Sequence, residues 1–159
     1  EQNRKQLLST PTINEHQVLD REQAMLRRAK QVFQYVLYEL HDTFGDKLEL
    51  EQELLVDLAN IVGYIYNMES AILRTKKAIQ ETGEEKNQLK RLYTEVYVQE
   101  TMEKVITNAK HALLAIDEND SQLQVRATLD KFLHQVSVNL IPKKREIARQ
   151  LIEEEKYVV

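Results

Sequence analysis

Histidine and carboxylate side chains on helices are the residues of this sequence that could bind a metal. A di-iron or di-manganese site in a helical bundle uses Glu-x-x-His on two helices, so that both side chains reach the same metal pair. None of the four histidines has a glutamate three positions before it, because the pairs are Ile13 and His16, Tyr38 and His41, Asn108 and His111, and Lys131 and His134. We therefore expect no metal site of this kind.

The other residue patterns that signal a ligand are incomplete or missing. The acidic stretch Asp117–Ser121 is similar to the start of a calcium loop, but an EF-hand needs Gly at its sixth position and Glu at its twelfth. Those positions hold Gln122 and Thr128, so we interpret the stretch as a turn. The three glycines are far apart, which leaves no phosphate cradle. The absence of cysteine excludes thiolate metal sites and thiol nucleophiles.

Glu69 and Glu100 are carboxylates that lie near the apolar face of a long predicted helix. One interpretation is a buried catalytic acid. The other is a polar contact that fixes how helices pair, with the candidate partners Arg74, Tyr66, Tyr93 and Tyr97. A buried carboxylate without a partner is costly, and catalysis needs a second converging group. We favour the structural interpretation and assign no catalytic, cofactor-binding or metal-binding residue to this chain.

The stretch Leu48–Thr82 is the predicted helix around which the fold is organised. Its apolar residues recur at spacings of four and three, which is the period of one helix face, and they are Leu54, Leu58, Ile61, Ile65, Met68 and Ile72. Leu55, Val62 and Ala71 widen this face, so we expect the helix to pack on several neighbours. Gly63 costs a helix about 1 kcal/mol relative to Ala, and we interpret it as a point of close approach between helices.

Further helices are expected before and after this central one. The first covers 18–44, and the later ones cover about 84–116 and about 121–140. The charged residues expected mostly outside the apolar face of the first helix are Arg21, Arg27, Arg28, Lys30 and Glu39. Gly45 and Gly83 are placed to end helices in a left-handed conformation, and the short turn after Gly45 predicts an antiparallel return. Pro142 bends the chain or opens a short fifth helix.

These elements predict one all-α domain over residues 1–159, preceded by a lead-in at residues 1–17. The fold class is an antiparallel helical bundle of four main helices plus a short C-terminal helix. Only three Gly and two Pro interrupt the 159 residues, which favours long helices over many short strands.

Composition narrows the expected partners and location. A net charge of −4 argues against nucleic acid as a partner. The absence of cysteine fits a reducing compartment, and no apolar signal segment follows the polar first residues, so we expect a cytoplasmic location. The chain begins with Glu1 rather than Met, which fits a piece of a longer chain or a trimmed one. Lys143, Lys144 and Arg145 could touch an anionic membrane peripherally, or they could form an ordinary solvated helix start.

The central helix carries the residues of a family resemblance. Ile65-Tyr66-Asn67-Met68-Glu69-Ser70, followed by Leu73-Arg74-Thr75, resembles the C-terminal helical extension of long- and very-long-chain-type acyl-CoA dehydrogenases, particularly bacterial ones. The resemblance extends from about Asp20 to Ile152. It is a helix-packing signature and contains no catalytic motif.

The resemblance implies that this chain is the last domain of a larger flavoenzyme of fatty-acid β-oxidation. In that family FAD, the acyl-CoA cleft and the catalytic glutamate belong to the preceding core, so the isolated chain is expected to hold no cofactor and to have no enzymatic activity. Its expected partner is this catalytic core, with a homodimer or a peripheral membrane contact as further options. The alternative is a free-standing helical interaction or scaffold protein.

Overall fold

The computed structural model describes residues 18–116, 123, 125–131 and 138–154, and within these ranges the protein is all-α without strands. Three long helices form the bundle: α2 (Asp20–Phe44), α3 (Gln52–Thr82) and α4 (Gln88–Leu113). Shorter helices are α6 (Ile141–Glu154), the 3-10 helices η1 (Gly45–Leu50) and η2 (Glu85–Asn87), and a helical stretch over 125–131. The predicted all-α class is therefore confirmed, whereas the lead-in and the acidic turn at 117–121 lie outside the described residues.

Glycines end the first two long helices, as predicted, although ψ at both lies outside the left-handed helical region that we expected. Gly45 follows α2 with φ +52° and Gly83 follows α3 with φ +88°. A side chain with a Cβ is strained in this region of backbone space, so glycine is the residue that reverses the chain there most easily. The backbone N–H of Gly83 donates to the carbonyl of Ile79 at 2.9 Å and closes the last turn of α3.

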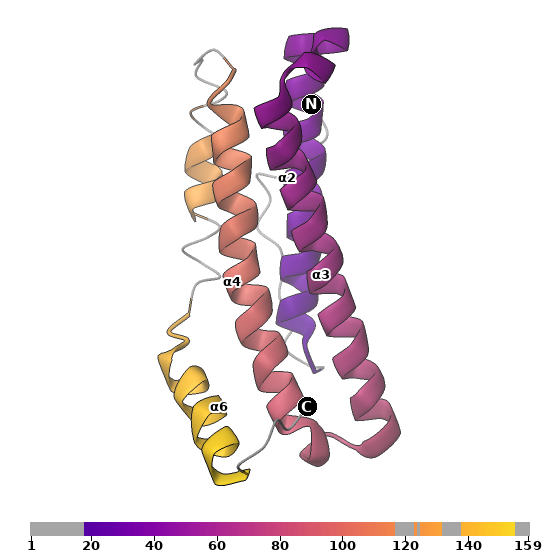
Figure 1. Ribbon diagram of the computed structural model, residues 1–159, viewed down its shortest axis with the longest axis vertical. Helices are drawn as coiled ribbons and strands as arrows, with labels where there is room; N and C mark the ends of the chain where they lie inside the picture. The colour runs from indigo at the N-terminus through magenta and orange to yellow at the C-terminus, as the bar shows by residue number, and fades with distance from the viewer. Residues whose placement is uncertain (1–17, 117–122, 124, 132–137, 155–159) are drawn as a thin grey trace.

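The connection between α2 and α3 differs from the short turn that we predicted. The 3-10 helix η1 occupies Gly45–Leu50, and α3 begins only at Gln52 rather than at Leu48. The tighter 3-10 geometry returns Leu48 to the core, where it is buried. The expected antiparallel return is nevertheless present, since α2 and α4 run in one direction and α3 in the other (Figure 1).

Two predicted helix ends also lie too far along the chain. α4 ends at Leu113, and residues 114–116 form a turn. Residues 138–140 are not helical, so the predicted helix over 121–140 does not reach Leu140. Asn139 instead accepts a hydrogen bond from the backbone N–H of Ile141 at 3.0 Å, which satisfies a free donor at the start of α6. Pro142 lies in the first turn of α6, where its missing N–H is tolerated.

The main core lies between α2, α3 and α4, and each of these helices contacts the other two. The central stripe of α3 is buried there as predicted, with Ile65 partly buried beside it. α4 contributes Met102, Ile106 and Leu113, all essentially inaccessible to solvent. The wide buried face of α2 also includes Arg28 and Glu39, which we had placed outside. A helix that packs against two neighbouring helices buries a wider face than a single narrow stripe. Arg28 and Glu39 lie on this wider face and are therefore buried.

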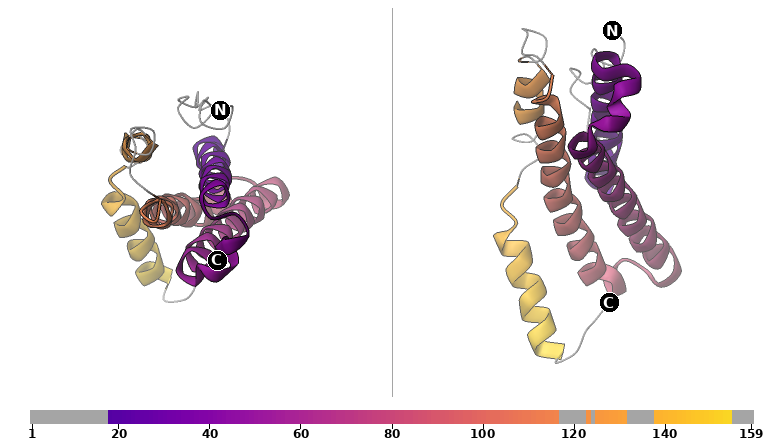
Figure 2. Two further views of the ribbon diagram at one scale, coloured as in Figure 1. Left: turned by 90° about the horizontal axis from the view of Figure 1, so that it is seen from above. Right: turned by 45° about the horizontal axis from the view of Figure 1, so that its top comes forward.

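A second, small apolar cluster attaches α6 to the bundle. Ile147 of α6 packs with Leu89 and Val96 of α4, and Leu151 packs against the same cluster. α6 lies beside α4 on the side away from α3 (Figures 1 and 2). It therefore leaves the outer side of α3 uncovered.

Candidate docking surface

Glu69 and Glu100 each form an ion pair between helices. Glu69 accepts a hydrogen bond from Lys30 Nζ at 2.7 Å, which joins α3 to α2. Glu100 pairs with Lys144 and joins α4 to α6. The structural role that we predicted for both carboxylates is present. The partners that we predicted are wrong, because both carboxylates use lysines from distant parts of the chain.

A contact that the sequence did not suggest joins α3 to α4. Asp57, which is buried on α3, lies 2.6 Å from Nδ1 of the exposed His111. Deeper between the same helices, the hydroxyl groups of Thr75 and Thr94 lie 2.7 Å apart. These polar groups satisfy one another across the helix interface. No sequence motif links the two members of either pair, because they are far apart in the chain. They meet only where α3 and α4 pack against each other.

Glu95 on α4 binds two basic side chains, Arg91 of α4 and Lys143 at the start of α6. It accepts hydrogen bonds from Arg91 Nε at 2.8 Å and from Lys143 Nζ at 2.5 Å. Burial alone would raise the pKa of Glu95, but the hydrogen bonds from Arg91 and Lys143 outweigh it and the pKa lies below its usual value. Burial raises the pKa of the neighbouring Glu22, and the negative charge of Glu95 raises it further.

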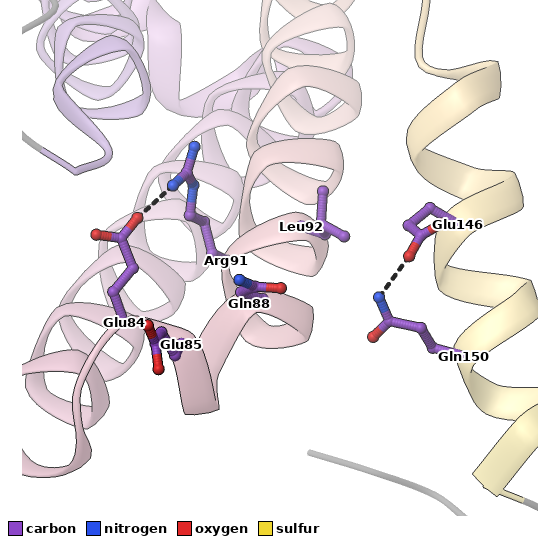
Figure 3. Close-up of a pocket in the computed structure, with 7 residues that line it drawn as sticks. All are labelled: Glu84, Glu85, Gln88, Arg91, Leu92, Glu146 and Gln150. Atoms are coloured by element: carbon purple, nitrogen blue, oxygen red, sulfur yellow. Dashed lines mark hydrogen bonds and ion pairs between the residues drawn. The ribbon is translucent and has the colours of Figure 1, made fainter.

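A hollow of about 400 Å³ separates the start of α4 from α6 (Figure 3). Its lining residues are mostly charged or amide-bearing, and they are Glu84, Glu85, Gln88, Arg91, Leu92, Glu146 and Gln150. Several of these groups already bind one another: Arg91 pairs with Glu84, and Gln150 donates to Glu146 at 2.6 Å. Across the described part of the chain, no three histidine or carboxylate side chains converge as a metal site would require.

The outer side of α3 carries an apolar stripe that nothing in the described structure covers. At spacings of three and four, its members follow the period of a helix face, and we define the outer stripe as Val56, Ala59, Gly63, Tyr66, Ser70 and Leu73. Val56 is 58% exposed, Tyr66 69% and Leu73 59%. Large apolar side chains gathered on one exposed helix face mark interaction surfaces in soluble proteins.

This outer stripe carries no exposed, unpaired charge. Between Leu54 and Leu73 the only charged residues are Asp57 and Glu69. Asp57 turns inward to His111, and Glu69 pairs with Lys30 at the seam with α2. Charged residues make up 30% of the whole chain. Their depletion over this face is the compositional signal of an interface core.

The seam between α2 and α3 extends the exposed apolar surface. Leu37 and Val62 lie one heptad from the Lys30–Glu69 ion pair, which places both at the same seam. Both side chains are exposed, as is Leu55 one further heptad along α3. The expectation that α3 packs on several neighbours is confirmed, since it contacts both α2 and α4. Within the residues that the structure describes, however, these contacts leave Leu55 and Val62 exposed.

Gly63 lies in the middle of the outer stripe. A Cβ built on Gly63 would meet no atom within 4 Å. The predicted close approach of a second helix is therefore not made by any helix that the structure describes. Both Gly63 and the neighbouring Ala59 are open to solvent, and together they form a shallow gap between Val56 and Tyr66.

The three cations at the start of α6 are less available than the sequence suggested. Lys143 and Lys144 are paired with Glu95 and Glu100 of α4, which leaves Arg145 exposed. None of the described helices is long and apolar enough to cross a membrane.

These contacts define the class of protein: a helical-bundle domain whose ionic groups mainly join its own helices, and whose α3 carries an exposed apolar stripe. The family described as "Acyl-CoA dehydrogenase, C-terminal domain" matches residues 28–131, and the chain belongs to this family.

Two relatives agree with this assignment. The chain is 40% identical over 142 residues to a "Probable acyl-CoA dehydrogenase" of Bacillus subtilis (strain 168), which covers 89% of this chain and 24% of that protein. It also superposes, with a TM-score of 0.88 and 38% identity, on the crystal structure of an acyl-CoA dehydrogenase complexed with FAD from Bacillus anthracis. That match covers 99% of this chain and 27% of the other. The chain therefore spans about a quarter of the length of these relatives.

Proposed function

We propose that this chain is the non-catalytic C-terminal accessory domain of an FAD-dependent acyl-CoA dehydrogenase of the long- or very-long-chain type, acting in fatty-acid β-oxidation. In this proposal the catalytic core holds FAD and performs the desaturation of the acyl-CoA. The domain packs on that core and stabilises it. We place the enzyme in the bacterial cytoplasm.

The observation that carries this proposal is the uncharged outer stripe of α3. Val56, Tyr66 and Leu73 are exposed on one helix face. Their apolar surface can be removed from water only when a partner packs against it. The polar side chains that could have formed a reaction site, Glu69 and Asp57 among them, are instead engaged in contacts between helices. About three quarters of each matched relative lies outside the part that this chain covers. This remaining part of the enzyme is the candidate partner for the outer stripe.

Removal of the domain from the complete dehydrogenase tests this role. The complete enzyme is compared with one that ends before this sequence, by following flavin fluorescence during heating and dye reduction with a long-chain acyl-CoA. We expect the shortened enzyme to release FAD at a lower temperature, while the part that remains folded still reduces the dye. An unchanged release temperature together with complete loss of turnover would contradict the accessory role.

The alternative from the sequence, a free-standing interaction or scaffold protein, would use the same outer stripe for another partner. An antibody against the chain separates the two on a blot of the source lysate. A band far above 18.7 kDa that coincides with a flavoprotein supports the domain, whereas a band near 18.7 kDa supports the free-standing protein.

A further inference from the structure

We infer that a helix of the dehydrogenase core packs along the outer stripe, over Ala59 and Gly63 and as far as Leu73. This inference rests on the proposed function and deepens it, because it names the docking surface and the kind of element that occupies it. The occupant is an α-helix with an uncharged, apolar face, contributed by the part of the dehydrogenase that precedes this domain.

The shape of the outer stripe favours a helix as the occupant. Ala59 and Gly63 are four residues apart and form one small-residue row, while Val56 and Tyr66 stand on either side of it. Ridges of side chains from one helix pack into such grooves on another. Space for such a ridge is open at Gly63, since a Cβ there would meet nothing within 4 Å. From Val56 to Leu73 the stripe extends about 25 Å, enough for several turns of a crossing helix.

The chemistry of the outer stripe favours an apolar protein surface over an ionic partner. Tyr66 is the largest exposed side chain of the stripe, and tyrosine is enriched among residues that dominate binding energy. Asn60 and Asn67 flank the stripe and provide a polar rim. Asp57 and Glu69, the charged residues within its length, are paired with His111 and Lys30. The next charged residues are Glu53 and Arg74, beyond its two ends.

The source of the helix is argued from the relatives. The B. anthracis enzyme, which the domain matches with a TM-score of 0.88, is nearly four times as long as the match. Most of such an enzyme therefore lies outside the described structure. Because the domain and core of one enzyme are held at high effective concentration, even a modest apolar surface between them becomes populated.

Thiol labelling of the complete dehydrogenase tests this surface, because this chain contains no natural cysteine. Leu73→Cys places a thiol on the outer stripe, and Leu114→Cys places one at a position of matched exposure elsewhere, since Leu73 is 59% and Leu114 63% exposed. Labelling by a maleimide is followed at each thiol by mass spectrometry. We expect the Leu73→Cys thiol to react at least tenfold more slowly. Equal rates at the two positions would overturn the inference.

A second variant examines the gap itself. Gly63→Gln adds a long side chain at an open helical position, so the domain still folds, and Thr107→Gln is a matched change on the exposed surface of α4. Combined with Leu73→Cys, we expect Gly63→Gln to restore fast labelling and Thr107→Gln to leave it slow. Continued protection in the presence of Gly63→Gln would count against a helix seated in the gap.

A photoreactive maleimide on Leu73→Cys identifies the occupant. A cross-link to a helical peptide of the core supports the inference, and a cross-link to the same stripe of a second copy overturns it. Failure of this inference is distinguishable from failure of the proposed function. If the outer stripe labels freely while removal of the domain still lowers the temperature of FAD release, the accessory role stands and only the docking surface is wrong.

Discussion

Lys143 Nζ lies 2.5 Å from Glu95 Oε2, and this ion pair joins the C-terminal helix α6 to α4. Glu95 is largely buried and also binds Arg91 at 2.8 Å, so one carboxylate carries two charged hydrogen bonds. The apolar contact of α6 with the bundle is small and centres on Ile147. Because the apolar contact is small, we infer that the ion pair with Glu95 contributes substantially to holding α6 against α4.

Glu95→Gln should weaken the attachment of α6. The change removes the negative charge and leaves Lys143 and Arg91 with a neutral acceptor. Since a hydrogen bond to a charged group contributes about 1.5–3 kcal/mol, we expect the free energy of unfolding to fall by about 2 kcal/mol, as measured by urea unfolding at pH 7. Glu153→Gln, at an exposed ion pair, serves as the control and should change it by less than about 0.5 kcal/mol. Equal effects of the two changes would contradict this role of Glu95.

The contributions of Glu95 and Glu22 to the free energy of unfolding should change with pH in opposite directions. The pKa of Glu95 is lowered in the folded protein, so its contribution is present above the unfolded value of 4.5 and is lost as the pH falls through the lower folded value. The pKa of Glu22 is raised by burial, so the folded state retains a proton that the unfolded state has lost. The contribution of Glu22 to stability therefore decreases as the pH rises from 4.5 through the folded pKa.

Glu22→Gln isolates the second of these effects. The amide cannot ionise, so the loss of stability above pH 4.5 caused by the buried charge should disappear. We expect a gain of about 1 kcal/mol in the free energy of unfolding at pH 8, and little or no gain at pH 4, where Glu22 is protonated in the folded state. Urea unfolding across this pH range measures the difference. A gain of the same size at both pH values would show that packing, rather than charge, is responsible.

Gly63→Ala should stabilise the chain by about 1 kcal/mol. Gly63 lies inside α3 without a positive φ, and a Cβ there meets nothing within 4 Å. Gly83→Ala is the matched control, because Gly83 has φ +88° and the same substitution there should destabilise. Thermal unfolding of both variants provides the comparison. A loss of stability for Gly63→Ala would mean that Gly63 is already in close contact.

Gln99→Met should also stabilise the chain. Gln99 is only 2% exposed, and its Nε2 has no hydrogen-bond partner among the residues that the structure describes. Methionine has similar length and removes the buried donor, so we expect a gain of about 1 kcal/mol, comparable to the cost of an unsatisfied buried group. Gln88→Met, at an exposed position of α4, should leave the unfolding midpoint unchanged. A lower midpoint for Gln99→Met would show that the amide is satisfied in solution.

The sequence predicted those features that depend on local periodicity. The spacing of Leu54, Leu58, Ile61, Met68 and Ile72 identified α3 and its buried face. Gly45 identified the end of α2, and Gly83 the end of α3. Helix ends were less accurate, because the tight turn of η1 and the capping of α6 by Asn139 depend on specific tertiary and backbone contacts.

Long-range polar pairs and the docking surface could not be predicted in the same way. Asp57 meets His111 only because two helices run antiparallel at a particular register. Periodicity placed Leu55 and Val62 at the edge of the apolar face, but it cannot say whether the element that covers them belongs to this chain. The same holds for Gly63: its type indicated close approach, and the structure shows that no described helix makes it.

Hydroxyl-radical footprinting of the unmodified complete dehydrogenase tests the central claim most directly. Tyr66 on the outer stripe is 69% exposed in the domain, and Tyr38 on α2 is 53% exposed. If the core covers α3, Tyr66 should be modified several times more slowly than Tyr38, in spite of its greater exposure within the domain. Faster modification of Tyr66 than of Tyr38 would show that the outer stripe faces solvent in the complete enzyme and would contradict the docking of this domain through α3.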